Sequence, residues 1–214
     1  MGEALVAALG IAVSPFAIVP AILLLFSARP GSTSGAFGGG WYAGITIVTV
    51  VALLAADLLT RPDVAPRWVT YTRIALGALL VVVGLSKFAR RGGEAKQPAW
   101  LASLETATPR GAARIGLLAS AANPKVALLA IAGGFALGAD LHGLGQEILA
   151  VLGFALVAAS TALLPALAFA IRGERVLGPL GVAKDWLVSR IDVLMSVILV
   201  VIGILLIAKG LSAL

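Results

Sequence analysis

Two short motifs place helix-breaking and polar residues inside apolar stretches of the sequence. The first is Ser14-Pro15 in "SPFAIVP", and the second is Asn123-Pro124-Lys125 in "SAANPKVALLAIAGG". Lys125 is the only charged residue in the stretch 115–139. A proline lacks a backbone donor and clashes with the carbonyl four residues back, so it frees polar backbone groups in a helix. Such groups beside a cation have the chemistry of an anion-binding site.

Asn123-Pro124 has the pattern of a helix N-cap followed by proline at the first helical position. It therefore predicts that a half-helix begins in the middle of the apolar stretch, with Lys125 beside its positive end. Ser14-Pro15 holds the equivalent place in the first stretch. The predicted substrate-binding residues are Ser14, Pro15, Asn123, Pro124 and Lys125.

Two roles without a ligand stay open for these motifs. Proline kinks occur in many helices that bind no ligand. Lys125 would reach the membrane surface by snorkelling if its helix began late, although a buried lysine is costly in a bilayer.

Further polar side chains lie in the apolar stretches. Those available to line a cavity are Thr46, Thr49, Ser120, Ser160 and Thr161, although each can equally bond the backbone of its own helix. Asp57 is expected near the outer end of the second stretch. It would pair with Arg73 across two helices or with Arg61 locally, as a structural ion pair. His142 is expected in a short outer loop, solvated.

Several kinds of chemistry lack their residues. The chain has no cysteine, which excludes disulfides, thiol redox chemistry and thiolate metal sites. No zinc-binding pattern, serine-triad spacing or phosphate-binding glycine loop is present. We therefore expect no enzymatic activity, no metal and no cofactor.

The composition makes lipid the solvent for most of the chain. Of its 214 residues, 60% are hydrophobic and 12% charged, with a mean hydropathy of +1.07. A bilayer core requires about 20 apolar residues as helix. Six apolar segments approach that requirement and predict six transmembrane helices: 4–28, 41–56, 74–86 (extending back to 68 if Arg73 snorkels), 115–139, 148–171 and 193–208.

Basic residues predict the orientation. With six crossings, both termini share a side with Arg61, Arg67, Arg73 and Lys209. The other side holds Arg29, Lys87, Arg90, Arg91, Lys96, Arg110, Arg114, Arg172, Arg175, Lys184 and Arg190. The positive-inside rule places this second side in the cytoplasm and both termini outside. The same rule explains the pI near 10.3 without nucleic acid. The segment after "MGE" lacks a basic n-region, so we expect a retained helix.

Trp41, Trp68, Trp100 and Trp186 fall at predicted helix ends or in a loop, as interfacial anchors do. The basic loop 89–114 contains one apolar helical face at 98–108, which predicts a short helix on anionic lipid.

The chain forms one predicted transmembrane domain, 1–214, with two halves, 1–88 and 115–214, on either side of the loop 89–114. Pro15 and Pro124 lie 109 residues apart, as do Gly44 and Gly153, and "LVVVG" (80–84) matches "LVVIG" (199–203) at an offset of 119. Each half has three crossings, so the second enters from the opposite face. This order predicts a 3+3 inverted repeat with kinked first and fourth helices.

The proline motif in the first helix, the "NPK" in the fourth, the basic central loop and the repeat resemble the LysE superfamily of exporters. The segment "ALGIAVSPFAIVPAILLLFSARPGSTSGAFGGGWYAG" is most similar to the GAP family, the peptidoglycolipid and sulfolipid addressing proteins. Amino-acid exporters of the superfamily usually have "PGP" where this chain has "SPFAIVP". The resemblance implies a plasma-membrane protein that exports or places lipid-linked material.

Three hypotheses follow. The first is a carrier that moves a glycolipid or another anionic amphiphile outward, with membrane lipids as its surroundings. The second is an accessory scaffold of a lipid synthesis or export complex. Export of a small solute such as an amino acid is an alternative to the lipid cargo of the first. A membrane enzyme acting on lipid comes third. A homodimer or contact with export machinery fits either of the first two, and a cavity reaching Lys125 would favour the carrier.

Overall fold

The structure is a computed structural model that describes residues 2–58, 67–89, 104, 106–141 and 143–190, with isolated residues between 193 and 211. All regular structure in these residues is helical, as the sequence predicts. The elements are α1 (Gly2–Ala12), α2 (Pro15–Leu23), the 3-10 turn η1 (Leu24–Phe26), α3 (Pro30–Leu58), α4 (Arg67–Ala89), α6 (Pro109–Ala121), α7 (Pro124–Asp140), α8 (Leu144–Arg172), the 3-10 turn η2 (Gly173–Val176) and α9 (Leu177–Ser189).

Long apolar helices and bent helix pairs make up the candidate membrane spans. α3 and α8 each have 29 residues and cover the predicted second and fifth crossings. α1 with α2 is bent by 45°, and α6 with α7 by 68°. The described residues thus contain two candidate spans, or up to four if each bent pair is one span. α4, with 23 residues, covers the predicted third crossing. The predicted sixth lies mostly outside the described residues.

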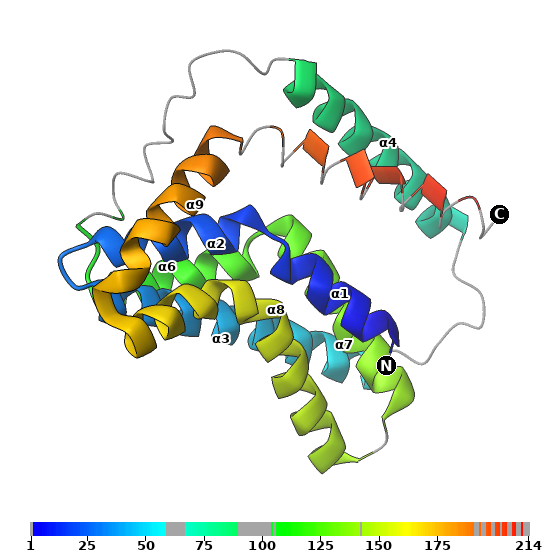
Figure 1. The fold of residues 1–214 in the computed structure, drawn as a ribbon. Helices are drawn as coiled ribbons and strands as arrows, with labels where there is room; N and C mark the ends of the chain where they lie inside the picture. The colour runs from blue at the N-terminus through cyan, green and yellow to red at the C-terminus, as the bar shows by residue number, and fades with distance from the viewer. Residues whose placement is uncertain are drawn as a thin grey trace. The chain divides into compact units, whose positions relative to one another are not determined.

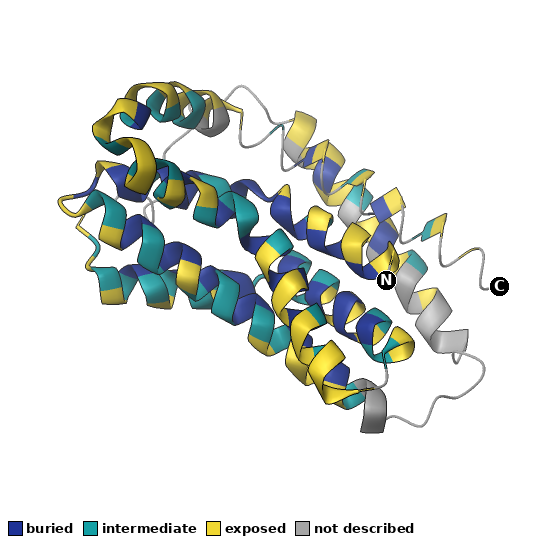
Figure 2. Ribbon diagram, turned by 60° about the horizontal axis from the view of Figure 1, so that its bottom comes forward, coloured by how far each residue is buried: buried dark blue, intermediate teal, exposed yellow. Residues whose placement is uncertain are grey.

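Apolar side chains lie on the outside of these helices. Val6 is 71% exposed, Leu149 73% and Ile171 80%. Figure 2 shows such exposed residues along much of α8. Large apolar side chains in contact with water would be unfavourable over so extensive a surface. The chain is therefore a multi-pass membrane protein.

The contacts divide the chain into two units. Unit 1 comprises Met1–Thr60 with Gln97–Asp185, and unit 2 comprises Arg61–Lys96 with Trp186–Leu214. Each unit draws on both predicted halves of the sequence.

Glycines allow α3 and α6 to pack backbone against backbone in unit 1. A Cβ atom on Gly40 would overlap the carbonyl oxygen of Ala113, and one on Gly116 would overlap the carbonyl oxygen of Phe37. A Cβ on Gly44 would overlap the Ser120 hydroxyl and lie 2.7 Å from the Leu117 carbonyl oxygen. Such close approach of small residues is the usual means of association of helices in lipid. It makes α3 the central helix of the unit, because α7 and α8 also pack against it.

The two bent pairs pack differently. α1 runs beside α7 and α8 (Figure 1). α2 packs against α3 and α8. α2 and α6, which are the other halves of the two bent pairs, do not pack against each other as α1 and α7 do.

In unit 2, α4 packs against the described residues of the last segment through glycines at matching places. A Cβ on Gly77 would lie 2.7 Å from the carbonyl oxygen of Gly203, and one on Gly203 would lie 2.6 Å from that of Gly77. A Cβ on Gly84 would lie 2.9 Å from the carbonyl oxygen of Ser196. The two segments therefore pack through glycines on both sides.

The predicted interfacial role of Trp41 is wrong. α3 begins eleven residues earlier, at Pro30, so Trp41 lies inside the helix, and it is fully buried. Its ring centroid lies 5.9 Å from that of Phe37. Trp186, near the end of α9, is 52% exposed, as expected of an anchor. Trp100, the side chain of Trp68 and most of the segment 98–108 lie outside the described residues.

The packing of α3 on α6 predicts opposite effects at two neighbouring glycines. Gly40→Ala should destabilise the protein by about 1–3 kcal/mol, because the methyl group would overlap the α6 backbone. Gly39→Ala has open space around the new methyl group and should be neutral or slightly stabilising, because alanine favours helix. Thermal unfolding in detergent measures both. Equal midpoints for the two variants would contradict this packing.

Candidate substrate-binding site

The first break lies between α1 and α2, at Val13 and Ser14. The last backbone bond of α1 runs from the Val13 N–H to the Leu9 carbonyl, at 3.1 Å. Ser14 then has extended backbone angles, φ −95° and ψ 119°, and Pro15 is the first residue of α2. The Ser14 carbonyl accepts from the N–H groups of Ala17 and Ile18 and so starts the new helix. The break at Pro15 is therefore confirmed.

A residue from α8 satisfies a carbonyl near this break. The Thr161 hydroxyl donates to the Ala12 carbonyl oxygen at 2.6 Å. Ala12 is the last residue of α1, so its carbonyl has lost the continuation of its helix. Thr161, which was predicted as a possible cavity residue, instead joins α8 to the end of α1.

The Ser14 hydroxyl, by contrast, has no partner among the described residues. Ser14 is fully buried, its side chain makes no capping bond to α2, and its Oγ forms no hydrogen bond there. An unsatisfied hydroxyl in an apolar interior is unfavourable by about 1–3 kcal/mol. It is therefore available to a bound group.

The second break, between α6 and α7, has the predicted cap. Asn123 has φ −75° and ψ 116°, close to the angles of Ser14, and Pro124 begins α7. The Asn123 Oδ1 accepts hydrogen bonds from the Lys125 N–H at 3.0 Å and from the Val126 N–H at 3.4 Å. The capping prediction is confirmed, with one change. The first backbone donors of α7 are taken by Asn123, so the cationic group that remains for a ligand is the Lys125 ammonium.

The register of α1 and α7 places Lys125 level with Ser14. The two helices are antiparallel neighbours: a Cβ on Gly10 would lie 3.2 Å from Leu129, and Ala8 shares a groove with Leu137 further along. Lys125 is one turn before Leu129 on the same face of α7, and Ser14 is four residues after Gly10, just beyond the end of α1. The two breaks thus meet at one level of the bundle.

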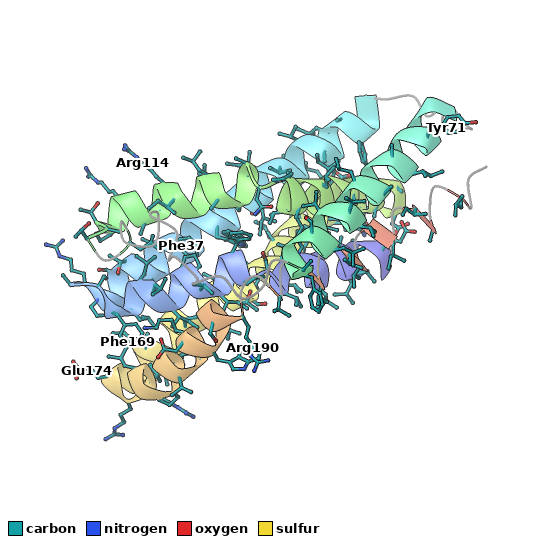
Figure 3. The ribbon with its side chains drawn as sticks, turned by 90° about the horizontal axis from the view of Figure 1, so that it is seen from above. Phe37, Tyr71, Arg114, Phe169, Glu174 and Arg190 are labelled. Atoms are coloured by element: carbon teal, nitrogen blue, oxygen red, sulfur yellow. The ribbon has the colours of Figure 1, made fainter. Side chains whose placement is uncertain are left out.

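Lys125 is partly buried and has no carboxylate partner among the residues that the structure describes. The ion pair that is seen among these residues joins two others: the Lys184 Nζ lies 3.1 Å from the Asp185 Oδ1. The side chains of Asp57 and Arg73, the predicted pair, lie outside the described set, as do Arg61 and His142. Arg114 of α6 is exposed and points outward (Figure 3).

Most of the other predicted polar residues bond their own helices. Three hydroxyls donate to carbonyls three or four residues back: Thr46 to Tyr42, Ser120 to Leu117 and Ser160 to Val157. Thr49 is fully buried, and its Oγ1 has no partner in the described part of the chain. Among the five candidates, Thr49 is therefore the one whose hydroxyl is available to a ligand.

An apolar groove of about 180 Å³ lies between α1, α7 and α8. Its lining residues include Ala4, Ala8, Leu137 and Phe154. Lys125 does not line it, so this groove is not the cavity that would separate a carrier from a scaffold. It begins about 9 Å along α1 from Ser14, at six residues of 1.5 Å each.

Within the described residues, no three histidine, aspartate or glutamate side chains are grouped as metal ligands would be.

A model of the Sap, sulfolipid-1-addressing protein, family matches residues 4–212. The chain belongs to this family. No curated protein and no solved structure matches it.

Membership of the sulfolipid-1-addressing family confirms the resemblance found in the sequence. The match extends over both breaks and over both units, so the site motifs lie inside the matched length rather than in an appended segment. The family name associates such proteins with sulfolipid addressing.

The cap at the second break predicts a measurable stability effect. Asn123→Ala should destabilise the protein by about 1 kcal/mol, because two N–H groups of α7 lose their acceptor. Asn123→Ser keeps an acceptor and should retain most of that stability. Unfolding midpoints in detergent would show the difference. A serine variant as unstable as the alanine variant would rule out capping as the reason.

Proposed function

We propose that the chain is a plasma-membrane carrier that moves an anionic glycolipid outward for the cell envelope. The observation that most supports this is the meeting of two helix breaks at the level of Lys125, a cation without a carboxylate partner in the described residues. A cation within a bilayer is costly unless it is paired or faces water, so a counter-charge stabilises it. A sulfated or phosphorylated headgroup would supply it during passage.

The proposal includes six crossings arranged as a 3+3 inverted repeat. Two pairs of contacts in unit 2 are compatible with it. The match of "LVVVG" with "LVVIG" pairs residues of the two segments that are 119 apart in number. Replacing each residue by its counterpart converts the contact of Gly77 with Gly203 into a contact of Ser196 with Gly84, and both contacts are present. The contact of Gly84 with Val200 likewise becomes that of Gly203 with Val81, which is also present. Contacts between antiparallel helices recur about every seven residues, so these contacts fit the repeat but would also arise between two antiparallel helices without it.

Unit 1 supports the same repeat with a different register for the second and fifth helices. α3 and α8 are of equal length and begin at positions 30 and 144, 114 residues apart. Gly44 of α3 packs against Ser120, near the end of α6. The corresponding contact in the other half joins α8 to the end of α1, and there the residue of α8 is Thr161. The match of Gly44 with Gly153 at 109 is thus not the alignment that the packing favours.

The two bent pairs differ in a way that suits alternating access. An inverted repeat with both halves in one conformation would pack α1 on α7 as it packs α2 on α6. α1 packs closely on α7, whereas α2 and α6 make far fewer contacts with each other. In carriers with inverted repeats, rocking of one half against the other exchanges two such arrangements. With the orientation predicted from the basic residues, α1 and α7 form the outer halves, so this arrangement is closed toward the outside.

The groove beside the breaks suits an amphiphile better than a small solute. A headgroup at Lys125 would lie next to an apolar surface formed by α1, α7 and α8. Acyl chains could follow that surface while the headgroup crosses between the helix ends. We propose transport without catalysis, with membrane lipid as partner and a homodimer or export machinery as further partners. The scaffold remains the second candidate, because Lys125 does not line the groove.

Replacing Lys125 tests the carrier. Lys125→Met should abolish appearance of the lipid at the cell surface at normal protein levels, because the headgroup loses its counter-charge. Lys125→Arg should restore export only in part, because a guanidinium is planar and longer. Lipid extracted from the outer envelope and quantified by mass spectrometry gives the readout. Full export by the methionine variant would leave the lysine as a structural charge.

Linking α1 to α7 tests alternating access. Gly10→Cys with Leu129→Cys places two thiols at a close contact in a chain that has no cysteine of its own. A short cleavable thiol cross-linker should stop export, because the packed arrangement can no longer open, and a reductant should restore it. The same reagent on either single variant is the control. Unchanged export at complete cross-linking would favour a scaffold.

A further inference from the structure

Three buried polar atoms have no hydrogen-bond partner in the described part of the chain: Ser14 Oγ, Trp41 Nε1 and Thr49 Oγ1. Buried polar groups without a partner are rare in native structures, and each calls for a physical reason. The indole N–H of Trp41 is the most informative of the three, because it can only donate. Whatever satisfies it must present an acceptor.

The turn between α2 and α3 fixes which residues of the two helices are level. The chain reverses after η1, where the Thr33 hydroxyl donates to the Leu24 carbonyl at 3.0 Å. Further along, the Ser34 hydroxyl donates to the Ala21 carbonyl at 2.8 Å. These two bonds hold the start of α3 against the end of α2, in antiparallel register.

That register places Trp41 at the level of Ser14. Trp41 is seven residues after Ser34 and therefore on nearly the same face of α3, and Ser14 is seven residues before Ala21. Both lie about 10 Å from the Ser34–Ala21 bond, along neighbouring helices. Two fully buried polar groups, neither with a partner among the described residues, thus stand at the level of the first helix break.

Trp41 also lies on the side of α3 that faces the second bent pair. A Cβ on Gly116 of α6 would lie 2.9 Å from the Trp41 backbone nitrogen. Trp41 thus belongs to the α3 surface between α6 and α2, two half-helices that make far fewer contacts with each other than α1 and α7 do. Phe37, one turn earlier, is buried among the helices (Figure 3). Thr49 lies eight residues further along α3 and is not at this level.

We propose that Trp41 Nε1, together with Ser14 Oγ, donates hydrogen bonds to an oxyanion oxygen of the lipid headgroup whose charge Lys125 balances. The inference rests on the proposed function and adds a residue to its site. A donor-only indole suits sulfate or phosphate oxygens, which accept and cannot donate when ionised. The tryptophan also gives a flat apolar surface beside the headgroup, where a sugar ring would pass.

The test uses a substitution that removes the N–H and keeps a large aromatic ring. Trp41→Phe should preserve the unfolding midpoint of the lipid-free protein in nanodiscs to within a few degrees. The matched control is Trp186→Phe, which removes an exposed indole far along the sequence. The probes are sulfatide, a sulfated galactosylceramide, and galactosylceramide itself, which lacks the sulfate. Binding is measured by native mass spectrometry at graded lipid concentrations.

Wild type and Trp186→Phe should bind sulfatide more tightly than galactosylceramide. Trp41→Phe should weaken sulfatide binding by about tenfold or more, as expected for a lost bond to a charged acceptor, and change galactosylceramide binding little. Undiminished sulfatide binding by Trp41→Phe, while Lys125→Met loses it, would overturn the role of Trp41 and leave the proposed function intact. Undiminished binding by Lys125→Met as well would count against the carrier itself.

Discussion

A helix broken inside a bilayer must find partners for the backbone groups that the break exposes, since lipid offers none. The two breaks meet this requirement by different means. Thr161 of α8 donates to the last carbonyl of α1, and Asn123 caps α7 with its own side chain. What is left over at the first break, the Ser14 hydroxyl, has no partner in the part of the protein that the structure describes. The protein thus stabilises both breaks, and the Ser14 hydroxyl is the group that the proposed ligand would satisfy.

Close packing of glycine faces on the central helix holds the breaks in place. Gly40, Gly44 and Gly116 let the backbones of α3 and α6 approach to a distance that larger side chains would prevent. Gly134 allows α7 the same approach to α3 near Thr49. Both halves of the second bent pair are therefore held against α3. The first pair lies against α8, with α2 also touching α3, and α8 in turn packs on α3, where Gly38 lies against Ala162 and Leu163.

Much of this arrangement can be predicted from the sequence, because its signals are local. Proline positions predicted both breaks, and Asn-Pro predicted a cap whose geometry depends on three residues. Partners from other helices could not be predicted in this way. Thr161 is separated from Ala12 by 149 residues, and no local pattern distinguishes its hydroxyl from that of Ser160. Trp41 was placed at a membrane surface because its apolar segment begins there, whereas small and polar residues extend α3 back to Pro30.

The central claim is that an anionic lipid headgroup binds where the two broken helices meet. A cryo-electron microscopy structure of the protein in nanodiscs containing sulfatide tests it most directly. The account predicts headgroup density within hydrogen-bonding distance of the Lys125 ammonium and the Trp41 indole nitrogen, with acyl chains leading toward the groove of α1, α7 and α8. Sulfatide found only in the lipid annulus, with Ser14 and Trp41 enclosed by protein and Lys125 extended to the membrane surface, would contradict it.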